Sequence, residues 1–296
     1  MSTLVMINGR LHHAETASIS VFDRGFLYGD SVFETIRTYA GVPFRLDEHL
    51  ARLGRSAERV WIPLPISLSE LGTETLTTLQ AAGNPESYIR VMLTRGQGEL
   101  GLAPVKEEQA CRVVIVSPLQ PPSAPAYAQG IGVTTYRTQR ATDCTAAAGA
   151  KVANYLVSVL ALRKAATVGA AEAVVVDGDQ CVVEGSTSNV FAVVRGTLVT
   201  PPEEAGILAG ITRACVLEVA RSLGIDVELR RLPLQELLDA EEAFISSSVR
   251  ELLPIVTVDG QRIGNGAPGP ITQELLAGFR RAIQSEIAKA SWPTLS

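Results

Sequence analysis

A chain of 296 residues is long enough for two domains of ordinary size or for one large α/β domain. Its 46% hydrophobic and 19% charged residues are typical of a soluble globular protein, and a net charge of −5 gives no general attraction to nucleic acid or anionic lipid. No apolar stretch approaches the roughly 20 residues of a membrane span, and the first residues lack a signal-peptide pattern. We therefore expect a cytoplasmic protein with no nucleic-acid or membrane partner.

Strand and helix patterns alternate in the first part of the chain. An alternating strand at 4–7 is followed by Asn8-Gly9, a pair typical of a two-residue hairpin turn. Apolar residues at helical spacing predict one helix from residue 46 and another at about 67–82. Further strands are predicted at 31–39, 87–94 and 112–116.

A proline-rich stretch follows these elements. The prolines among residues 118–125 remove backbone donors and restrict φ, so this stretch is predicted not to be helical. We therefore predict an N-terminal α/β domain over 1–117, an interdomain linker over 118–129 and a C-terminal α/β domain over 130–296.

The second part begins with a strand at 131–137 and continues with a helix at about 154–168 and another at 212–223. Between the helices lies a meander of short strands, predicted at 172–177, 180–184, 189–194 and 197–200. This order of elements indicates an α/β (α+β) protein with much antiparallel pairing rather than a doubly wound parallel sheet.

Two familiar kinds of site are disfavoured by spacing. The four cysteines and three histidines form no metal-ligand pattern and no Cys-x-x-Cys pair, so we expect neither a metal site nor a disulfide framework. Residues 96–101 fit the dinucleotide pattern Gly-x-Gly-x-x-Gly, but Pro104 stands where the required helix should begin. We expect this loop to shape a pocket wall instead.

Lys151 is a candidate for covalent chemistry. It is one of 4 lysines, against 22 arginines, and it lies among small residues at 146–153 that allow a planar ligand to approach closely. Desolvation would lower the pKa of its amine from about 10.4 and make it available as a nucleophile or Schiff-base former. The alternative is a lysine that extends into solvent from an alanine-rich helix start.

An anion site and a buried carboxylate are also predicted. Gly210 precedes a helix whose first amides and positive dipole end favour a phosphate, although an ordinary helix capped by Thr212 would have the same sequence. Glu184 ends an apolar strand and should be partly buried, so it needs a donor or cationic partner, which could equally be an arginine in a structural ion pair. A lysine, an anion site and a carboxylate are together what pyridoxal phosphate requires. Tyr155 could donate to the ring hydroxyl of this cofactor or pack on its helix.

Ordered blocks of sequence resemble the class IV, fold type IV, pyridoxal-phosphate aminotransferases over nearly the whole chain. The blocks lie at 28–37, 49–53, 88–90, 151–156, 184–191, 210–213 and 248–254. The resemblance implies a two-domain homodimeric enzyme with the cofactor at the domain interface. It implies that Lys151 is catalytic, holding the cofactor as an aldimine and moving a proton, and that Glu184 faces the pyridine nitrogen. The other implied cofactor-binding residues are Arg52, Tyr155, Ser188, Asn189, Gly210, Ile211, Thr212 and Ser248, of which Arg52, Ile211, Thr212 and Ser248 would bind the phosphate.

Three subfamilies fit these blocks: branched-chain L-amino-acid aminotransferases, D-amino-acid aminotransferases and aminodeoxychorismate lyases. Most of the implied substrate residues resemble the branched-chain enzymes, whereas Asn154, Thr35 and Arg250 depart from them. The implied substrate-binding residues are Tyr28, Phe33, Thr35, Arg37, Tyr88, Arg90, Val249 and Arg250. Arg250 would recognise a second carboxylate, such as that of 2-oxoglutarate, or turn to solvent.

We expect transamination between a branched-chain amino acid and 2-oxoglutarate. The other two subfamily activities are the alternatives within the family. Outside it, the alternatives are a cofactor-free Schiff-base lyase, which needs Lys151 but no phosphate site, and a non-catalytic cofactor-binding protein.

Overall fold

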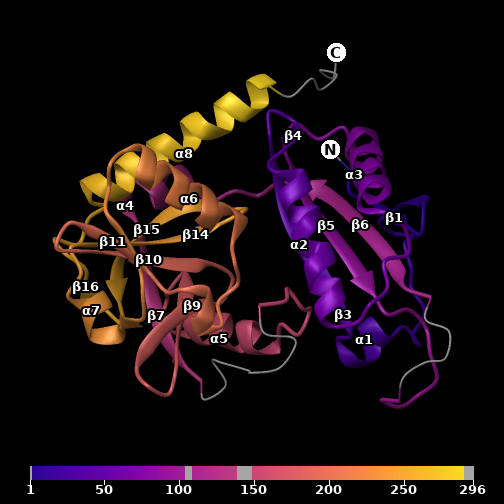
Figure 1. The fold of residues 1–296 in the computed structure, drawn as a ribbon, viewed down its shortest axis with the longest axis horizontal. Coiled ribbons are helices and arrows are strands. Elements are labelled where there is room, and N and C mark those ends of the chain that lie inside the picture. Colours follow the sequence, from indigo (N-terminus) through magenta and orange to yellow (C-terminus); the bar gives the residue numbers. More distant parts are fainter. Residues whose placement is uncertain (1, 104–108, 139–148, 290–296) are drawn as a thin grey trace. The chain divides into compact units, whose positions relative to one another are not determined.

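The computed structural model describes residues 2–103, 109–138 and 149–289, and its contacts divide them into two compact units (Figure 1). Unit 1 contains the described residues up to Gln120, the segment 150–154 and the residues from Glu286 onward. Unit 2 contains the described residues of 121–149 and 155–285. The segment 150–154, which carries Lys151, thus packs with unit 1, whereas the domain bounds expected from the sequence assigned it to the C-terminal half.

Unit 1 is an antiparallel sheet with two helices on one face. Its strands are β1 (Leu4–Ile7), β2 (Arg10–His13), β3 (Ser31–Tyr39), β4 (Val42–Pro43), β5 (Ser87–Thr94) and β6 (Cys111–Pro118). They lie in the order β2-β1-β6-β5-β3-β4. The helices are the short α1 (Arg24–Tyr28), α2 (Leu46–Arg59) and α3 (Leu68–Ala82), of which α2 and α3 contact the sheet.

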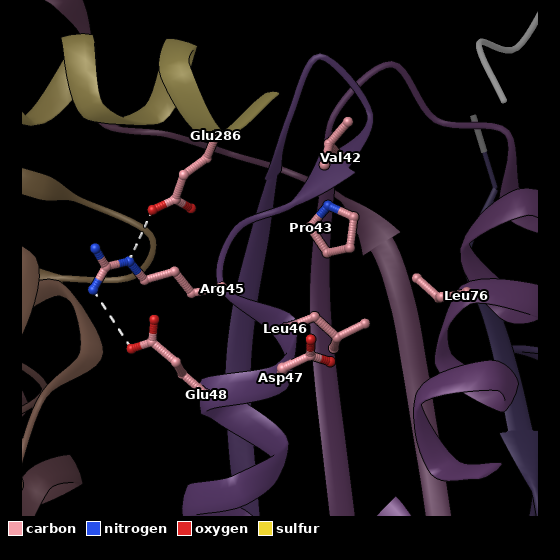
Figure 2. Close-up of a pocket in the computed structure, with 8 residues that line it drawn as sticks. All are labelled: Val42, Pro43, Arg45, Leu46, Asp47, Glu48, Leu76 and Glu286. Carbon is pink, nitrogen blue, oxygen red and sulfur yellow. Dashed lines mark hydrogen bonds and ion pairs between the residues drawn. The ribbon is translucent and has the colours of Figure 1, made fainter. Parts of the chain in front are cut away.

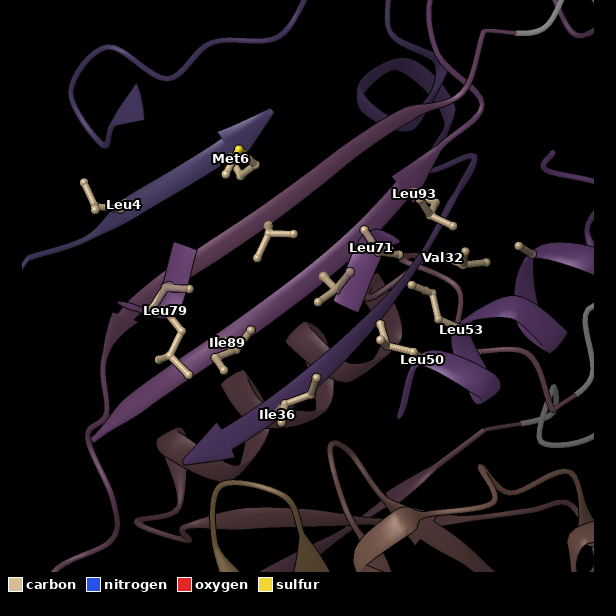
Figure 3. Close-up of a cluster of buried hydrophobic side chains, with 14 of the residues drawn as sticks. Leu4, Met6, Val32, Ile36, Leu50, Leu53, Leu71, Leu79, Ile89 and Leu93 are labelled. Carbon is tan, nitrogen blue, oxygen red and sulfur yellow. The ribbon is translucent and has the colours of Figure 1, made fainter. Parts of the chain in front are cut away.

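The core of unit 1 lies between this sheet and α2 and α3. Alternate residues of β3 and β5, such as Val32, Ile36 and Ile89, point toward Leu50 and Leu53 of α2, and all five are at most 3% exposed (Figure 3). Residues of β3 with odd numbers therefore lie on the opposite face of the sheet.

Turn and helix-cap residues of unit 1 adopt the conformations that their sequence predicts. Asn8 and Gly9 take φ values of 48° and 82°, the left-handed conformation that a type I′ hairpin turn requires. Ser67 and Glu70 form a reciprocal capping box at the start of α3. The strands and helices expected in this part of the chain are confirmed.

Unit 2 is built on a mixed sheet of ten strands. They are β7 (Ile131–Arg137), β8 (Glu172–Val176), β9 (Cys181–Gly185), β10 (Asn189–Val194), β11 (Thr197–Thr200), β12 (Val227–Leu229), β13 (Leu232–Pro233), β14 (Glu242–Ser247), β15 (Glu251–Val258) and β16 (Gln261–Arg262). The order is β12-β11-β10-β14-β15-β7-β8-β9-β13, with β16 paired to β15. Among the described strands, β7 pairs in parallel with β8 and β15, and β11 with β12, while the other pairings are antiparallel. The predicted α+β class is confirmed.

Five α-helices and a short 3-10 turn accompany this sheet. They are α4 (Ala124–Gln129), α5 (Leu156–Thr167), η1 (Glu203–Ala205), α6 (Ile211–Ser222), α7 (Leu234–Leu238) and α8 (Pro270–Lys289). Helix α5 contacts β7 and β8, and α6 contacts β12 and β14. Within the described ranges, no helix combines the length and apolar character needed to cross a membrane.

One prediction about the proline-rich stretch is wrong. Residues 118–125 were expected to contain no helix, but α4 begins at Ala124 with Pro125 in its first turn. Proline is tolerated there, because the first amides of a helix have no intrahelical acceptor and the ring already holds a helical φ. The predicted linker thus ends in a helix that belongs to unit 2.

Parts of some predictions lie outside the described residues. These are Pro104 in the glycine-rich loop, Cys144, and the small residues 146–148 before Lys151.

Candidate active site

Lys151 lies alongside the first residues of β3 in unit 1. Its carbonyl oxygen accepts a hydrogen bond from the Phe33 amide at 3.0 Å, and the Ala153 amide donates to the Ser31 carbonyl at 2.9 Å. The Lys151 amide donates to Ser56 Oγ on α2 at 3.1 Å. The backbone of Lys151 is therefore fixed by both the sheet and the helix.

The side chain of Lys151 shares an aromatic ring with an arginine. Its Nζ lies 4.7 Å from the centroid of Phe33, and the guanidinium carbon of Arg90 lies 3.8 Å from the same centroid. Phe33 is 1% exposed. A primary amine, a buried ring and a second cation are thus brought together, and a cation above a ring is attracted by its quadrupole.

Five predicted substrate residues lie on one face of the sheet. In the register of β3 with β5, Thr35 is opposite Arg90 and Arg37 is opposite Tyr88. Thr35 Oγ1 and the Tyr88 hydroxyl are 3.4 Å apart. Because side chains alternate along a strand, these residues and Phe33 point away from the core of unit 1.

Tyr28 is bound to the glycine-rich loop. Its hydroxyl accepts a hydrogen bond from the Gly101 amide at 2.8 Å, and Arg24 Nη1 donates to the Gly101 carbonyl at 3.0 Å. The described residues of this loop therefore pack against α1.

Behind β3, a buried carboxylate holds Arg52. Glu34 is completely buried and accepts from Arg52 Nε and Nη2, both at 2.7 Å, while His49 Nδ1 lies 2.7 Å from Glu34 Oε2. Burial alone would raise the pKa of Glu34, but the hydrogen bonds and charges of Arg52 and His49 outweigh it and lower the pKa to about 2. Burial lowers the pKa of His49.

The sequence alone predicts no role for Glu34 or His49. The available signal was a glutamate in an otherwise apolar strand, followed by a helix with His49 and Arg52 three residues apart, a spacing that places both on one helix face. The structure thus shows what orients the guanidinium of Arg52, while the phosphate contact of Arg52 stays a prediction.

In unit 2, two predicted cofactor residues hold the loop before α6. Glu184 Oε2 accepts from the Leu208 amide at 3.1 Å, and Asn189 Nδ2 donates to the Leu208 carbonyl at 2.9 Å. A Cβ at Gly210 would lie only 2.1 Å from Asn189 Oδ1, so the close approach requires glycine. The predicted donor partner of Glu184 is therefore, at least in part, a backbone amide.

The start of α6 has the arrangement of an anion site. Its N-cap is Gly210, which has no capping side chain, and the first intrahelical bond runs from the Ala214 amide to the Gly210 carbonyl at 2.9 Å. The amides of Ile211 and Thr212 consequently have no acceptor within the helix. The alternative of an ordinary helix capped by Thr212 is wrong, since Thr212 lies inside the first turn.

Two buried serine hydroxyl groups lie in β14 and directly before β10. Ser188 Oγ and Ser246 Oγ have no hydrogen-bond partner among the described residues, and their side chains belong to residues only 8% and 1% exposed. Ser246 is the strand partner of Asn189, which contacts Gly210. Unsatisfied buried hydroxyls are costly, so these groups fit a ligand with several acceptor oxygens, such as a phosphate ester.

Arg250 has a partner that neither sequence alternative anticipated. Its Nη1 forms an ion pair with Glu172, its Nη2 donates to Thr187 Oγ1 at 2.5 Å, and its Nε donates to Ser247 Oγ at 3.3 Å. Arg250 therefore neither turns to solvent nor presents an unpaired guanidinium.

The remaining predicted residues are located as follows. Tyr155 is the N-cap residue of α5 in unit 2, and Ser248 and Val249 lie in the turn between β14 and β15. Their contacts with a ligand stay predictions. No group of His, Cys, Asp and Glu within the described ranges has an arrangement that could hold a metal ion.

A separate cavity of about 350 Å³ lies in unit 1 away from Lys151 (Figure 2). Arg45 stands between Glu48 and Glu286 there, with Nη1 to Glu48 Oε2 at 3.5 Å and Nε to Glu286 Oε1 at 3.1 Å. None of the residues lining it is a predicted site residue.

Comparison with known proteins gives concordant matches. The family model described as amino-transferase class IV matches residues 31–258. A protein of Methanocaldococcus jannaschii named "Putative branched-chain-amino-acid aminotransferase" is 39% identical over 276 residues, covering 93% of this chain and 95% of that protein. A D-alanine aminotransferase of Bacillus licheniformis is 34% identical over 290 residues, covering 96% and 99%.

Solved structures match over the same length. The branched-chain amino acid aminotransferase of Escherichia coli superposes with a TM-score of 0.91 at 31% identity and covers 97% of this chain and 96% of that one. The branched-chain amino acid aminotransferase of Thermobaculum terrenum, in its PLP-bound holo-form, gives a TM-score of 0.85 at 28% identity, covering 95% and 94%.

Proposed function

Because this chain belongs to the class IV aminotransferases, which use pyridoxal phosphate, we propose that it exchanges amino groups between a branched-chain L-amino acid and 2-oxoglutarate. Family membership sets aside the cofactor-free lyase and the non-catalytic binding protein. When bound, pyridoxal phosphate supplies an electron sink that stabilises negative charge on the carbon next to the substrate's amino group.

The observation that carries the proposal is that an amine and a guanidinium lie close to the same aromatic ring, that of Phe33. Lys151 Nζ and Arg90 lie 4.7 and 3.8 Å from its centroid. In our proposal the amine of Lys151 would hold the cofactor and would also act as the general base that moves the proton at the substrate's α-carbon. The buried ring of Phe33 makes the surroundings of both groups apolar, which suits an aliphatic side chain.

The neighbouring polar residues suit the carboxylates of the substrates. Arg90 and Arg37 supply guanidinium groups on the face of the sheet that carries Phe33, and Tyr88 and Thr35 supply hydroxyls there. Guanidinium groups bind carboxylates through two parallel hydrogen bonds, which orients the bound acid as well as holding it.

Residues of unit 2 and Arg52 would hold the cofactor. The amides of Ile211 and Thr212 and the buried hydroxyls of the serine residues described above fit its phosphate. Glu184, in our proposal, faces the pyridine nitrogen and keeps it protonated.

We also propose a homodimer that forms through an apolar patch on unit 1, the α1 patch. It consists of Phe22, Phe26, Leu100 and Leu102, which are 50%, 67%, 72% and 78% exposed. The Gly98 amide donates to the Phe22 carbonyl at 3.2 Å. The glycine-rich loop and the residues around α1 therefore form one surface. Large exposed apolar patches of this kind are typical of interaction sites.

Donor specificity tests the reaction. With 2-oxoglutarate as acceptor, we expect L-leucine to be used in preference to D-alanine, and aminodeoxychorismate to release no pyruvate. Preference for D-alanine would favour the second candidate, a D-amino-acid aminotransferase, which the 34% identical D-alanine aminotransferase supports.

The role of Lys151 is tested separately. Lys151→Ala should abolish turnover and the borohydride-stable attachment of cofactor. Lys164→Ala is the matched control, because the Lys164 amine donates instead to the Thr135 carbonyl at 2.8 Å. Full activity in Lys151→Ala would contradict the assignment.

A further inference from the structure

Three side chains of unit 2 hold Arg250 through oxygen atoms. Each of its three guanidinium nitrogens has a protein partner: Glu172 at Nη1, Thr187 at Nη2 and Ser247 at Nε. A substrate carboxylate binds arginine best through two parallel N–H groups. The edge that includes Nε can accept such a ligand only if Ser247 gives way, because Nε has a single N–H, and Glu172 balances the charge of the guanidinium.

Glu172 is the strongest of these partners and cannot move away. It is completely buried, and its Oε1 accepts from Ser186 Oγ at 2.6 Å and from the Thr187 amide at 3.1 Å, while its Oε2 faces Arg250. The side chain of Arg250 is 18% exposed. The guanidinium therefore lies within reach of solvent and solutes, whereas the carboxylate does not.

The pair joins two loops that carry predicted ligand residues. Glu172 binds Ser186 and Thr187, which directly precede Ser188 and Asn189. Arg250 lies in the turn between β14 and β15, directly after Ser248 and Val249.

We propose that Glu172 determines substrate specificity by occupying Arg250. This inference rests on the proposed transaminase function. The buried carboxylate balances the positive charge that would otherwise attract the second carboxylate of glutamate or 2-oxoglutarate, so these substrates gain no affinity from Arg250 over an aliphatic partner. Glu172 belongs to the same chain and is always beside Arg250, so its effective concentration there is high. A carboxylate of a dissolved substrate would have to compete with it for the guanidinium.

The test removes the charge of Glu172 while keeping its shape. The measurement is the ratio of kcat/KM for glutamate to kcat/KM for leucine, each as the enantiomer that the enzyme accepts. In Glu172→Gln this ratio should rise about tenfold or more, which is the contribution of one charge-assisted hydrogen bond to binding. The double variant Glu172→Gln/Arg250→Ala should lose this gain.

Glu242→Gln is the matched control. Glu242 is 7% exposed and in unit 2, but it accepts from the Ile271 and Thr272 amides at the start of α8 at 3.0 and 2.7 Å. It should leave the glutamate-to-leucine ratio unchanged. An unchanged ratio in a folded Glu172→Gln that binds cofactor would overturn the specificity role and leave the proposed function standing. A wild-type protein that transaminates no donor would overturn both.

A second measurement applies even if Glu172→Gln does not fold. In Glu172→Gln/Arg250→Ala, which removes both charges, the ratio of KM for 2-oxoglutarate to KM for 4-methyl-2-oxopentanoate should equal that of the wild type, since a neutralised Arg250 contributes nothing to binding a substrate's second carboxylate. A general loss of activity cancels in this ratio. A selective rise of about tenfold for 2-oxoglutarate would show that Arg250 binds substrate and would refute the proposal.

Discussion

A buried carboxylate lies behind the predicted phosphate-binding arginine. Arg52 is 5% exposed and donates to Glu34 through two of its nitrogens. Removing one member of such a pair leaves the other charge buried without compensation. We expect Glu34→Gln to lower the free energy of unfolding of the apoprotein by about 3 kcal/mol, measured by urea denaturation.

A pair with an exposed carboxylate, at the start of α2, provides the control for this variant. Glu48 is 50% exposed and lies 3.5 Å from Arg45, so Glu48→Gln should cost less than about 1 kcal/mol. Equal effects of the two substitutions would contradict the importance of burial at Glu34.

The same carboxylate makes stability dependent on pH. The pKa of Glu34 is about 2 in the folded chain against an ordinary value of 4.5, so the unfolded chain binds more protons between these values. The stabilisation is complete above pH 4.5 and is lost as the pH falls toward 2. The depressed pKa of His49 acts in the same direction from pH 6.5 downward. Glu34→Gln should reduce the decline below pH 4.5, and the remainder comes from other carboxylates with lowered pKa values, such as Asp259. An unchanged decline would assign all of it to those other carboxylates.

Gly210 is expected to be essential for cofactor binding. Gly210→Ala places a Cβ at 2.1 Å from Asn189 Oδ1, so the loop that holds Leu208 must shift. We expect the Kd of pyridoxal phosphate to rise roughly tenfold or more, measured by absorbance titration. Gly178→Ala is the control, because no atom lies within 4 Å of a Cβ there. Similar affinities of the two variants for pyridoxal phosphate would contradict the predicted phosphate site at the start of α6.

At the scale of single elements, the cap of α3 is a local determinant of stability. Ser67 Oγ accepts from the Glu70 amide at 3.2 Å, and the Glu70 carboxylate accepts from the Ser67 amide at 2.8 Å. Ser67→Ala should lower the free energy of unfolding by about 1 kcal/mol. Ser69→Ala, in the exposed first turn of the same helix, should have a much smaller effect by the same measurement.

Elements with local signals could be predicted from the sequence. β3, β7 and β11 have the predicted bounds, because alternation and turn residues determine them within a few positions. The helix α4 was missed because the prolines were treated as uniformly disruptive, although position in the first turn decides their effect.

Contacts between distant segments could not be predicted in this way. The ordered motifs predict a pyridoxal-phosphate site from the sequence. They do not predict that Arg250 pairs with Glu172, which is 78 residues away in the chain. Glu34 precedes Arg52 by 18 residues, on a different element. Such pairs depend on which strand lies beside which loop, and no spacing rule within one element encodes that.

At the scale of the whole molecule, the α1 patch predicts the oligomeric state. Phe26→Asp should convert the proposed dimer into a monomer, because a charge at an apolar interface must be desolvated on association. Light scattering after size exclusion gives the mass. Leu229→Asp, which alters an exposed leucine of unit 2, should leave the mass unchanged. A dimeric Phe26→Asp would place the interface elsewhere.

The path of the chain through the two units has a consequence for recombination. The chain leaves unit 1 after Gln120, returns for residues 150–154 and departs again, so the segment bonded to Phe33 and Ser31 belongs to the first unit in space but to the second part in sequence. A chimera joined at residue 120 would therefore inherit its β3 from one parent and its lysine from the other. Such a junction would separate β3 from the segment to which it is hydrogen-bonded, and crossovers that keep both from one parent should be sought after residue 154 instead.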